Sequence, residues 1–280
     1  MRLHRKIRTA VAVACTVTLG AAPLLVHTAA TARTADAAIQ SITVKVAKKT
    51  INVKGANGLR SGRVQVTMKG GSAEIVMFKK GYDAKDLAKD IAALDKGDIK
   101  ALKRALAHTT FLGGFEKGGS GTVVLPKAGD YSVFSFESRG VAEFSAGSVK
   151  KAPTPKTDGT IVAKTGPKWA GSSTLPAAGT FQFKNKDKTV PHFVILQHVA
   201  EGTTTDQVLE ALQNDTGNGP PPPFLLPESL ETASLNPGHS MTVDYDLPAG
   251  QYVIMCFFPD PKMGGMPHAL MGMLEMIHLM

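Results

Sequence analysis

The sequence predicts an all-β chain of two tandem β-sandwiches, each interrupted by one helical insertion. Short stretches such as 42–46, 64–66 and 181–183 alternate apolar and polar residues and are bounded by glycine and proline, which is typical of half-buried antiparallel strands. Strand-like motifs of the first half recur in the same order about 120 residues later, and such recurrence indicates repeated units. A helical pattern occurs in the corresponding place of each half.

Three pairs of segments carry the internal similarity. AGDYSVFS at 128–135 matches AGQYVIMC at 249–256. The other pairs are SGTVVLP at 120–126 with SMTVDYDLP at 240–248, and residues 63–78 with 180–196. We interpret the ordered matches as a duplicated domain; the alternative is a coincidence of generic strand patterns.

The helical insertions differ in length. The first spans 83–107 and repeats apolar residues such as Leu87, Ile91 and Leu94 at helical spacing, with a break at Gly97. The second, at 205–213, is shorter. A segment rich in proline, lysine and threonine separates the halves and is typical of a linker. The predicted divisions are a signal peptide at 1–37, a first sandwich at 38–148, a linker at 149–157 and a second sandwich at 158–280.

The first residues have the layout of a secretory signal peptide. Four basic residues among the first eight precede an apolar run and then small residues in Ala-x-Ala patterns. We therefore expect a secreted or extracytoplasmic protein of the cell envelope. No later stretch is long and apolar enough to suggest a transmembrane segment.

The charge of the exported chain is mildly positive. Removing residues 1–37 takes away five of the 32 Lys and Arg residues and one of the 23 Asp and Glu residues, which leaves about +5. Basic residues do not cluster with aromatic ones, so no nucleic-acid partner is expected. The oligomeric state is not predicted.

Sulfur and imidazole ligands gather near the C-terminus. The stretch YVIMCFFPDPKMGGMPHALMGMLEMIHLM at 252–280 holds Cys256, two histidines and seven of the eleven methionines. Cys15 would leave with the signal peptide, so Cys256 would be the single thiol of the exported chain. Each residue type has an ordinary alternative role: a buried thiol, a structural histidine and adaptable core methionines.

Three motifs in the second half resemble the cupredoxin family of small blue copper proteins. These are VPHFVIL at 190–196, LPAGQYVIMC at 247–256 and HALMGML at 268–274. The resemblance implies a Greek-key sandwich and one copper ion, with His192, Cys256, His268 and Met273 as ligands and Met271 as the alternative axial ligand. Two imidazoles and a thiolate with a weak thioether are the ligand set of such electron-transfer sites.

The chain departs from the family pattern in two places. Eleven residues separate Cys256 from His268, whereas the family has only a few. The first half lacks the ligands: Ser135 stands where Cys256 stands, and about Ala73 where His192 stands. The first sandwich is therefore expected to bind no copper.

An enzyme is disfavoured. Multicopper oxidases and copper nitrite reductases need His-x-His pairs and a histidine beside the blue-site cysteine, but Met255 and Phe257 flank Cys256. The favoured hypothesis is an exported copper protein that transfers single electrons to a redox partner at the cell envelope. The alternatives are a Cu(I)-binding and handling protein, suggested by the methionines, and a metal-free cupredoxin-like interaction module.

Overall fold

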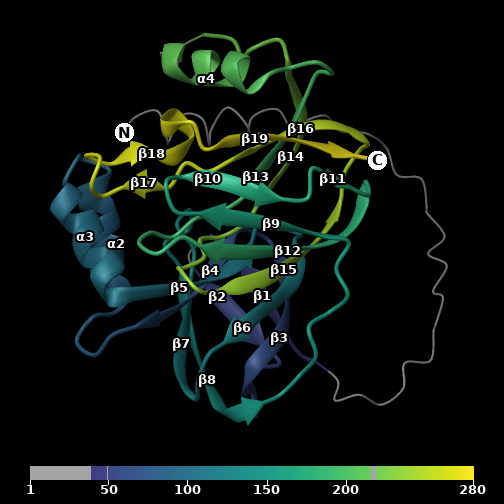
Figure 1. Cartoon of the computed structure of the whole chain (residues 1–280). Helices are drawn as coiled ribbons and strands as arrows, with labels where there is room; N and C mark the ends of the chain where they lie inside the picture. The colour runs from purple at the N-terminus through teal and green to yellow at the C-terminus, as the bar shows by residue number, and fades with distance from the viewer. Residues whose placement is uncertain (1–38, 49, 216–218) are drawn as a thin grey trace.

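The computed structural model describes residues 39–48, 50–215 and 219–280, and in this part of the chain it is an all-β protein of two tandem sandwiches. The first half forms the lower part of Figure 1 and the second half the upper part. The predicted fold class, an all-β chain of two tandem sandwiches with a helical insertion in each, is confirmed. The predicted signal peptide lies outside the described residues.

The strands of the first half make two sheets. Its strands are β1 (Gln40–Val46), β2 (Ile51–Lys54), β3 (Arg60–Lys69), β4 (Ala73–Phe78), β5 (Thr109–Phe115), β6 (Ser120–Leu125), β7 (Gly129–Phe134) and β8 (Val141–Lys150). One sheet pairs β1 with β3 and β3 with β6, and the other runs β5-β4-β7-β8. Strand β8 also pairs with the start of β3 and so links the two sheets.

The second half repeats the main pairings of the first and adds the β17–β18 hairpin. Its strands are β9 (Gly159–Lys164), β10 (Lys168–Gly171), β11 (Thr174–Leu175), β12 (Ala178–Lys186), β13 (Ile195–Val199), β14 (Leu225–Glu231), β15 (Ser240–Asp246), β16 (Gly250–Met255), β17 (Pro259–Asp260), β18 (Met266–Pro267) and β19 (Leu274–Leu279). The pair β9–β12 is parallel, as β1–β3 is. The order β14-β13-β16-β19 corresponds to β5-β4-β7-β8.

The helical insertions occur where the sequence predicts them. The first is a pair, α2 (Ala84–Leu94) and α3 (Ile99–His108), and the second is α4 (Thr205–Asn214). Asp83 and Asp98 cap the first pair, because each side chain accepts hydrogen bonds from two backbone N–H groups of the first turn. Gly97 has a φ of +97° between the helices, which explains the break there. None of the helices in the described ranges is long and apolar enough to cross a bilayer.

The segment between the halves begins later than predicted. Residues 149 and 150 complete strand β8, where Lys150 is paired with Gly62. Residues 151–157 have no regular secondary structure and lead into β9. Residues 149 and 150, which were predicted to lie in the linker, therefore belong to β8, which pairs with β3.

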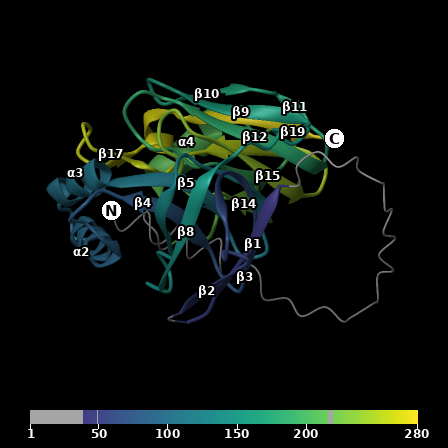
Figure 2. The same ribbon diagram turned by 90° about the horizontal axis from the view of Figure 1, so that it is seen from below.

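The two halves pack directly on each other. Buried side chains of both belong to one apolar cluster, in which Gly113 of β5 lies so close to Met241 of β15 that an added Cβ would stand 2.5 Å from its sulfur. Between the sandwiches, Asn236 N–H donates to Phe111 O and Phe111 N–H donates to Asn236 Oδ1, both at 2.8 Å. Viewed from below, the first half lies against the sheets of the second (Figure 2). The halves thus share a core.

Candidate metal centre

Strand register brings the predicted ligand segments to one end of the second sandwich. Met255, the last residue of β16, pairs with Ile195 at the start of β13 and with Leu274 at the start of β19. Cys256 directly follows β16, Met273 directly precedes β19, and His192 lies three residues before β13. Because neighbouring strands are antiparallel, the segment that follows β16 and the segments that precede β13 and β19 meet at the same end of the sheet.

The long interval between Cys256 and His268 returns to the sheet as a hairpin. Strands β17 and β18 pair Pro259 with Pro267, and His268 then opens a short 3-10 helix, η1 (His268–Met271). Two backbone hydrogen bonds close the loop: His268 N–H donates to Phe258 O at 3.1 Å, and Ala269 N–H donates to Cys256 O at 2.7 Å. The eleven intervening residues therefore leave His268 beside Cys256.

Three of the four predicted ligands form a compact triangle of donor atoms. The distance between the two Nδ1 atoms of His192 and His268 is 3.1 Å. Cys256 Sγ lies 3.6 Å from Nδ1 of His192 and 3.7 Å from Nδ1 of His268. All three side chains are fully buried. The structure thus places these atoms as a potential metal-binding cluster.

The dimensions of this triangle suit a first-row transition metal. The point equidistant from three atoms with these separations lies about 2.0 Å from each, which matches metal–nitrogen bonds of about 2.0 Å and is slightly short of a metal–sulfur bond of about 2.3 Å. A thiolate with two imidazoles in a trigonal arrangement is the donor set preferred by type 1 copper. The residues present therefore fit a copper ion.

The fourth predicted ligand, Met273, is fully buried and follows His268 by five residues in the sequence. Its N–H donates to His268 O at 3.0 Å, and its carbonyl accepts a 3.1 Å hydrogen bond from Trp169 Nε1. Met271, the alternative axial ligand, lies in η1 and is half-buried. Burial is the observation that favours Met273 over Met271.

Without a bound cation, the electrostatics of the triangle keep its three donors uncharged. Burial lowers the pKa of both histidines to about 4, and for His192 the neighbouring His268 contributes to the lowering. Burial also raises the pKa of the Cys256 thiol to about 12, although the backbone N–H groups of Phe193 and Phe258 oppose this. Neutral imidazoles are ready to bind a metal, and a bound cation would displace the thiol proton.

Sequence reasoning missed several residues that hold the ligands in place. Asn185 Nδ2 donates to Val190 O at 3.0 Å and to Leu235 O at 2.8 Å, which ties the chain before His192 to a neighbouring segment. Carboxylates face the outer nitrogens of both histidines: Asp187 Oδ2 is 3.6 Å from His192 Nε2, and Asp260 Oδ2 is 3.9 Å from His268 Nε2. Both aspartates begin short turns, which the sequence could have indicated. That local signal does not predict that each carboxylate lies near a histidine, because the fold brings the two together.

Among the described residues of the first half, no comparable cluster of donors lies at the equivalent end. Ser135 follows β7 as Cys256 follows β16, and it is fully buried, with its Oγ accepting from Ser138 N–H. Pairing of Glu74 with Phe134 matches that of Ile195 with Met255. Counting back three residues puts Gly71, and not Ala73, at the counterpart of His192, because the sequence match alone misplaced the register by two residues.

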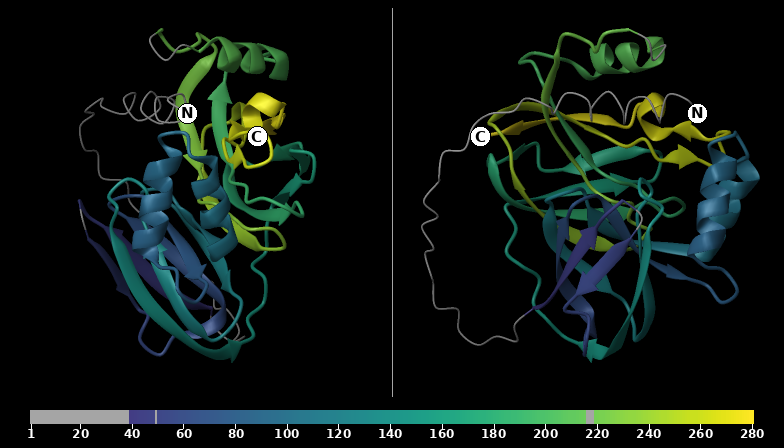
Figure 3. Two further views of the ribbon diagram at one scale, coloured as in Figure 1. Left: turned by 90° about the vertical axis from the view of Figure 1, so that its left-hand side faces the viewer. Right: turned by 180° about the vertical axis from the view of Figure 1, so that it is seen from behind.

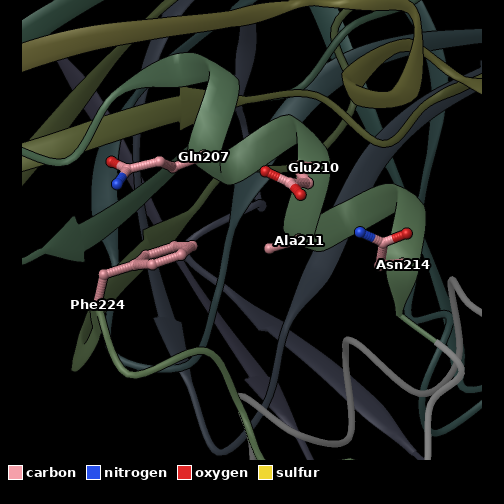
Figure 4. A pocket seen from close by; sticks show the side chains of 5 residues that line it. All are labelled: Gln207, Glu210, Ala211, Asn214 and Phe224. Carbon is pink, nitrogen blue, oxygen red and sulfur yellow. The ribbon is translucent and has the colours of Figure 1, made fainter.

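A surface cavity lies away from these donors. It has a volume of about 270 Å³, and Figure 4 shows its wall of α4 side chains facing Phe224. Its lining residues are Gln207, Glu210, Ala211, Asn214 and Phe224. None of the predicted ligands lines it, so the buried donor triangle is the stronger candidate for function.

Comparisons with known proteins find similar structures but no matching family model and no matching curated protein. Reduced auracyanin from the photosynthetic bacterium Roseiflexus castenholzii is 20% identical over 43% of this chain and 94% of its own, with a TM-score of 0.28. Auracyanin B is 25% identical over 47% of this chain and 93% of its own, with a TM-score of 0.26. A multicopper oxidase is 12% identical over 86% of this chain and 88% of its own, with a TM-score of 0.24. With TM-scores this low, the likeness transfers no function to this chain.

Proposed function

We propose that this protein is an exported copper protein whose second sandwich binds one copper ion and exchanges single electrons with a redox partner at the cell envelope. The observation that carries the proposal is the buried triangle of His192, Cys256 and His268, whose edges of 3.1 to 3.7 Å suit one metal ion. Copper in such a set cycles between Cu(II) and Cu(I). The sandwich strands on which the ligands are mounted would keep the geometry in both states.

The repeated strand pairing supports a duplicated domain in which one copy lost or never gained ligands. Under this proposal the first sandwich supports the second and binds no copper. Ser135 at the position of Cys256 cannot supply a thiolate.

The test is addition of Cu(II) to the chain lacking residues 1–37, followed by visible absorption and electron paramagnetic resonance spectroscopy. We expect an intense thiolate-to-copper band and narrow copper hyperfine splitting, both abolished in Cys256→Ala. Ser135→Ala is the matched control, because it changes the equivalent residue of the first sandwich, and it should leave both signals unchanged. A colourless protein with ordinary tetragonal copper would contradict electron transfer.

A second candidate function, Cu(I) binding and handling, is favoured by one observation. Met263 and Met266 lie on the hairpin between Cys256 and His268 with 53% and 44% of their surfaces exposed, and thioethers prefer Cu(I). This candidate predicts slower Cu(I) uptake from a chelator in Met263→Leu/Met266→Leu, with Met280→Leu, another exposed methionine, as the control. Cu(I) binding no tighter than Zn(II) binding would eliminate it.

A further inference from the structure

The two histidines of the donor triangle share an unusual arrangement. Each turns Nδ1 toward the centre and Nε2 toward a buried or nearly buried carboxylate, Asp187 for His192 and Asp260 for His268. The side-chain exposures of these two carboxylates are 3% and 14%. Both Nε2 atoms are buried and have no hydrogen-bond partner within the described ranges, since the carboxylates stand slightly beyond hydrogen-bond distance.

The two aspartates are held in the same way. Asp187 Oδ1 accepts hydrogen bonds from Thr189 N–H and Oγ1 and from Val190 N–H, at 2.6, 2.9 and 3.2 Å. Asp260 Oδ1 accepts from the N–H groups of Lys262 and Met263, at 2.6 and 3.2 Å. In both residues the turn occupies Oδ1, and Oδ2 is left to face the histidine.

This arrangement determines which nitrogen of each imidazole carries the proton. A carboxylate accepts hydrogen bonds and does not donate them, so it favours a proton on the Nε2 that faces it. A neutral imidazole with a proton on Nε2 has its lone pair on Nδ1. Both Nδ1 lone pairs then point toward Cys256 Sγ and toward each other, as a shared cation requires.

We propose that Asp187 and Asp260 are positioning residues that fix the histidine tautomers of the copper site and, through their two negative charges, favour Cu(II) over Cu(I). The charge effect rests on the proposed function, whereas the tautomer effect does not. Carboxylates behind metal-bound histidines raise ligand basicity in other metalloproteins. Here the two negative charges are nearly excluded from water, so they are poorly screened.

Asparagine substitutions test both roles. In Asp187→Asn and Asp260→Asn the amide oxygen can keep the turn hydrogen bonds, which places the amide N–H₂ opposite Nε2. Two donors would then face each other, so the proton should move to Nδ1. Asp83→Asn is the control: it removes the same charge from a residue whose Oδ1 accepts two backbone hydrogen bonds at the start of α2.

The first readout needs no metal. Nitrogen-15 NMR of the metal-free chain should show the Nε2–H tautomer for His192 and His268 in the wild type. Asp187→Asn should shift His192 to the Nδ1–H form, and Asp260→Asn should do so for His268. Unchanged tautomers in both variants would overturn the positioning role. Should Asp187→Asn not fold, Asp260→Asn on the hairpin decides alone.

The second readout is the reduction potential of the copper-loaded chain. Each site variant should lower Cu(II) affinity about tenfold more than Cu(I) affinity, which raises a one-electron potential by about 59 mV, while Asp83→Asn should leave it unchanged. An unchanged potential in the site variants would overturn the charge effect. A wild type that binds no copper at these donors would refute the proposed function instead, and the NMR comparison would still decide the tautomer role.

Discussion

At the scale of single residues, the three proposed strong ligands and the proposed axial ligand are held in different ways. The donors of His192, Cys256 and His268 are close enough to share one ion. A thioether on the axis bonds weakly and mainly tunes the reduction potential. The backbone of Met273 is fixed from both sides, by His268 O and by the Trp169 indole N–H.

Substitution of the two methionines distinguishes the axial ligand. Met273→Leu nearly conserves volume, so we expect it to cost less than about 1.5 kcal/mol of stability. Loss of the thioether should raise the reduction potential by tens of millivolts, a change of several-fold in the ratio of Cu(II) to Cu(I) affinity. Spectroelectrochemistry measures this shift. Met271→Leu is the control, and a shift in that variant alone would make Met271 the axial ligand.

At the scale of elements, the helical pair of the first half covers the ligand loop of the second. Helices α2 and α3 lie beside the β17–β18 hairpin in Figure 1 and in both views of Figure 3. The contact is close: a Cβ on Gly265 would stand 2.6 Å from Ile99 Cδ1. The first sandwich thus supports the hairpin that returns His268 to the site.

Alanine substitutions at two adjacent glycines measure this support. Gly264 and Gly265 both have positive φ, +66° and +84°, but a Cβ on Gly264 would meet nothing within 4 Å. Gly264→Ala should therefore cost only backbone strain, about 1–2 kcal/mol. Gly265→Ala should cost about 0.5–1.5 kcal/mol more, because its Cβ also displaces the end of the Ile99 side chain.

The measurement is chemical denaturation of both variants, alone and combined with Ile99→Ala. Shortening Ile99 should remove the extra cost at Gly265 and leave the cost at Gly264 as it was. Equal costs at the two glycines would show that α3 does not press on the hairpin.

At the scale of the whole molecule, the interface between the halves reaches the metal centre. Leu235 bridges to Leu112 of β5 on one side and to His192 on the other. Two acids line the same interface, the buried Glu74 and the half-buried Glu116. Glu116 Oε1 accepts from Glu231 N–H at 3.1 Å, and Glu74 Oε1 accepts from Ser234 Oγ at 3.2 Å. Burial raises the pKa of Glu116 from its ordinary value of 4.5 to about 7.

The stability of the joined halves should consequently depend on pH. Because the pKa of Glu116 is higher in the folded state, the folded state binds more protons between pH 4.5 and 7, and this carboxyl makes stability fall as pH rises through that range. Since Glu116 is partly exposed, we expect a loss of about 1–3 kcal/mol. Glu116→Gln keeps the acceptor and should be the more stable protein at pH 8 but not at pH 4. Urea denaturation across this range measures the difference, and parallel pH profiles of the two proteins would refute it.

The sequence alone determined the all-β class, the two sandwiches, the helical insertions and the candidate ligands. Strand alternation and helical spacing involve residues that are close in the sequence, so both patterns can be recognised from the sequence alone. The helix caps at Asp83 and Asp98 are equally local. The ligand motifs could be found because each is a short continuous stretch that resembles a known copper-binding motif.

Only the tertiary structure decided whether these ligands meet and what surrounds them. His268 returns on the β17–β18 hairpin, which Ile99 of the other sandwich contacts at Gly265. The pairing of Asp187 and Asp260 with the histidines depends on the direction in which each turn aims its second carboxylate oxygen. Such relations join residues through space, and the free energy that creates them comes from a core shared by both halves. No local pattern in the sequence encodes them.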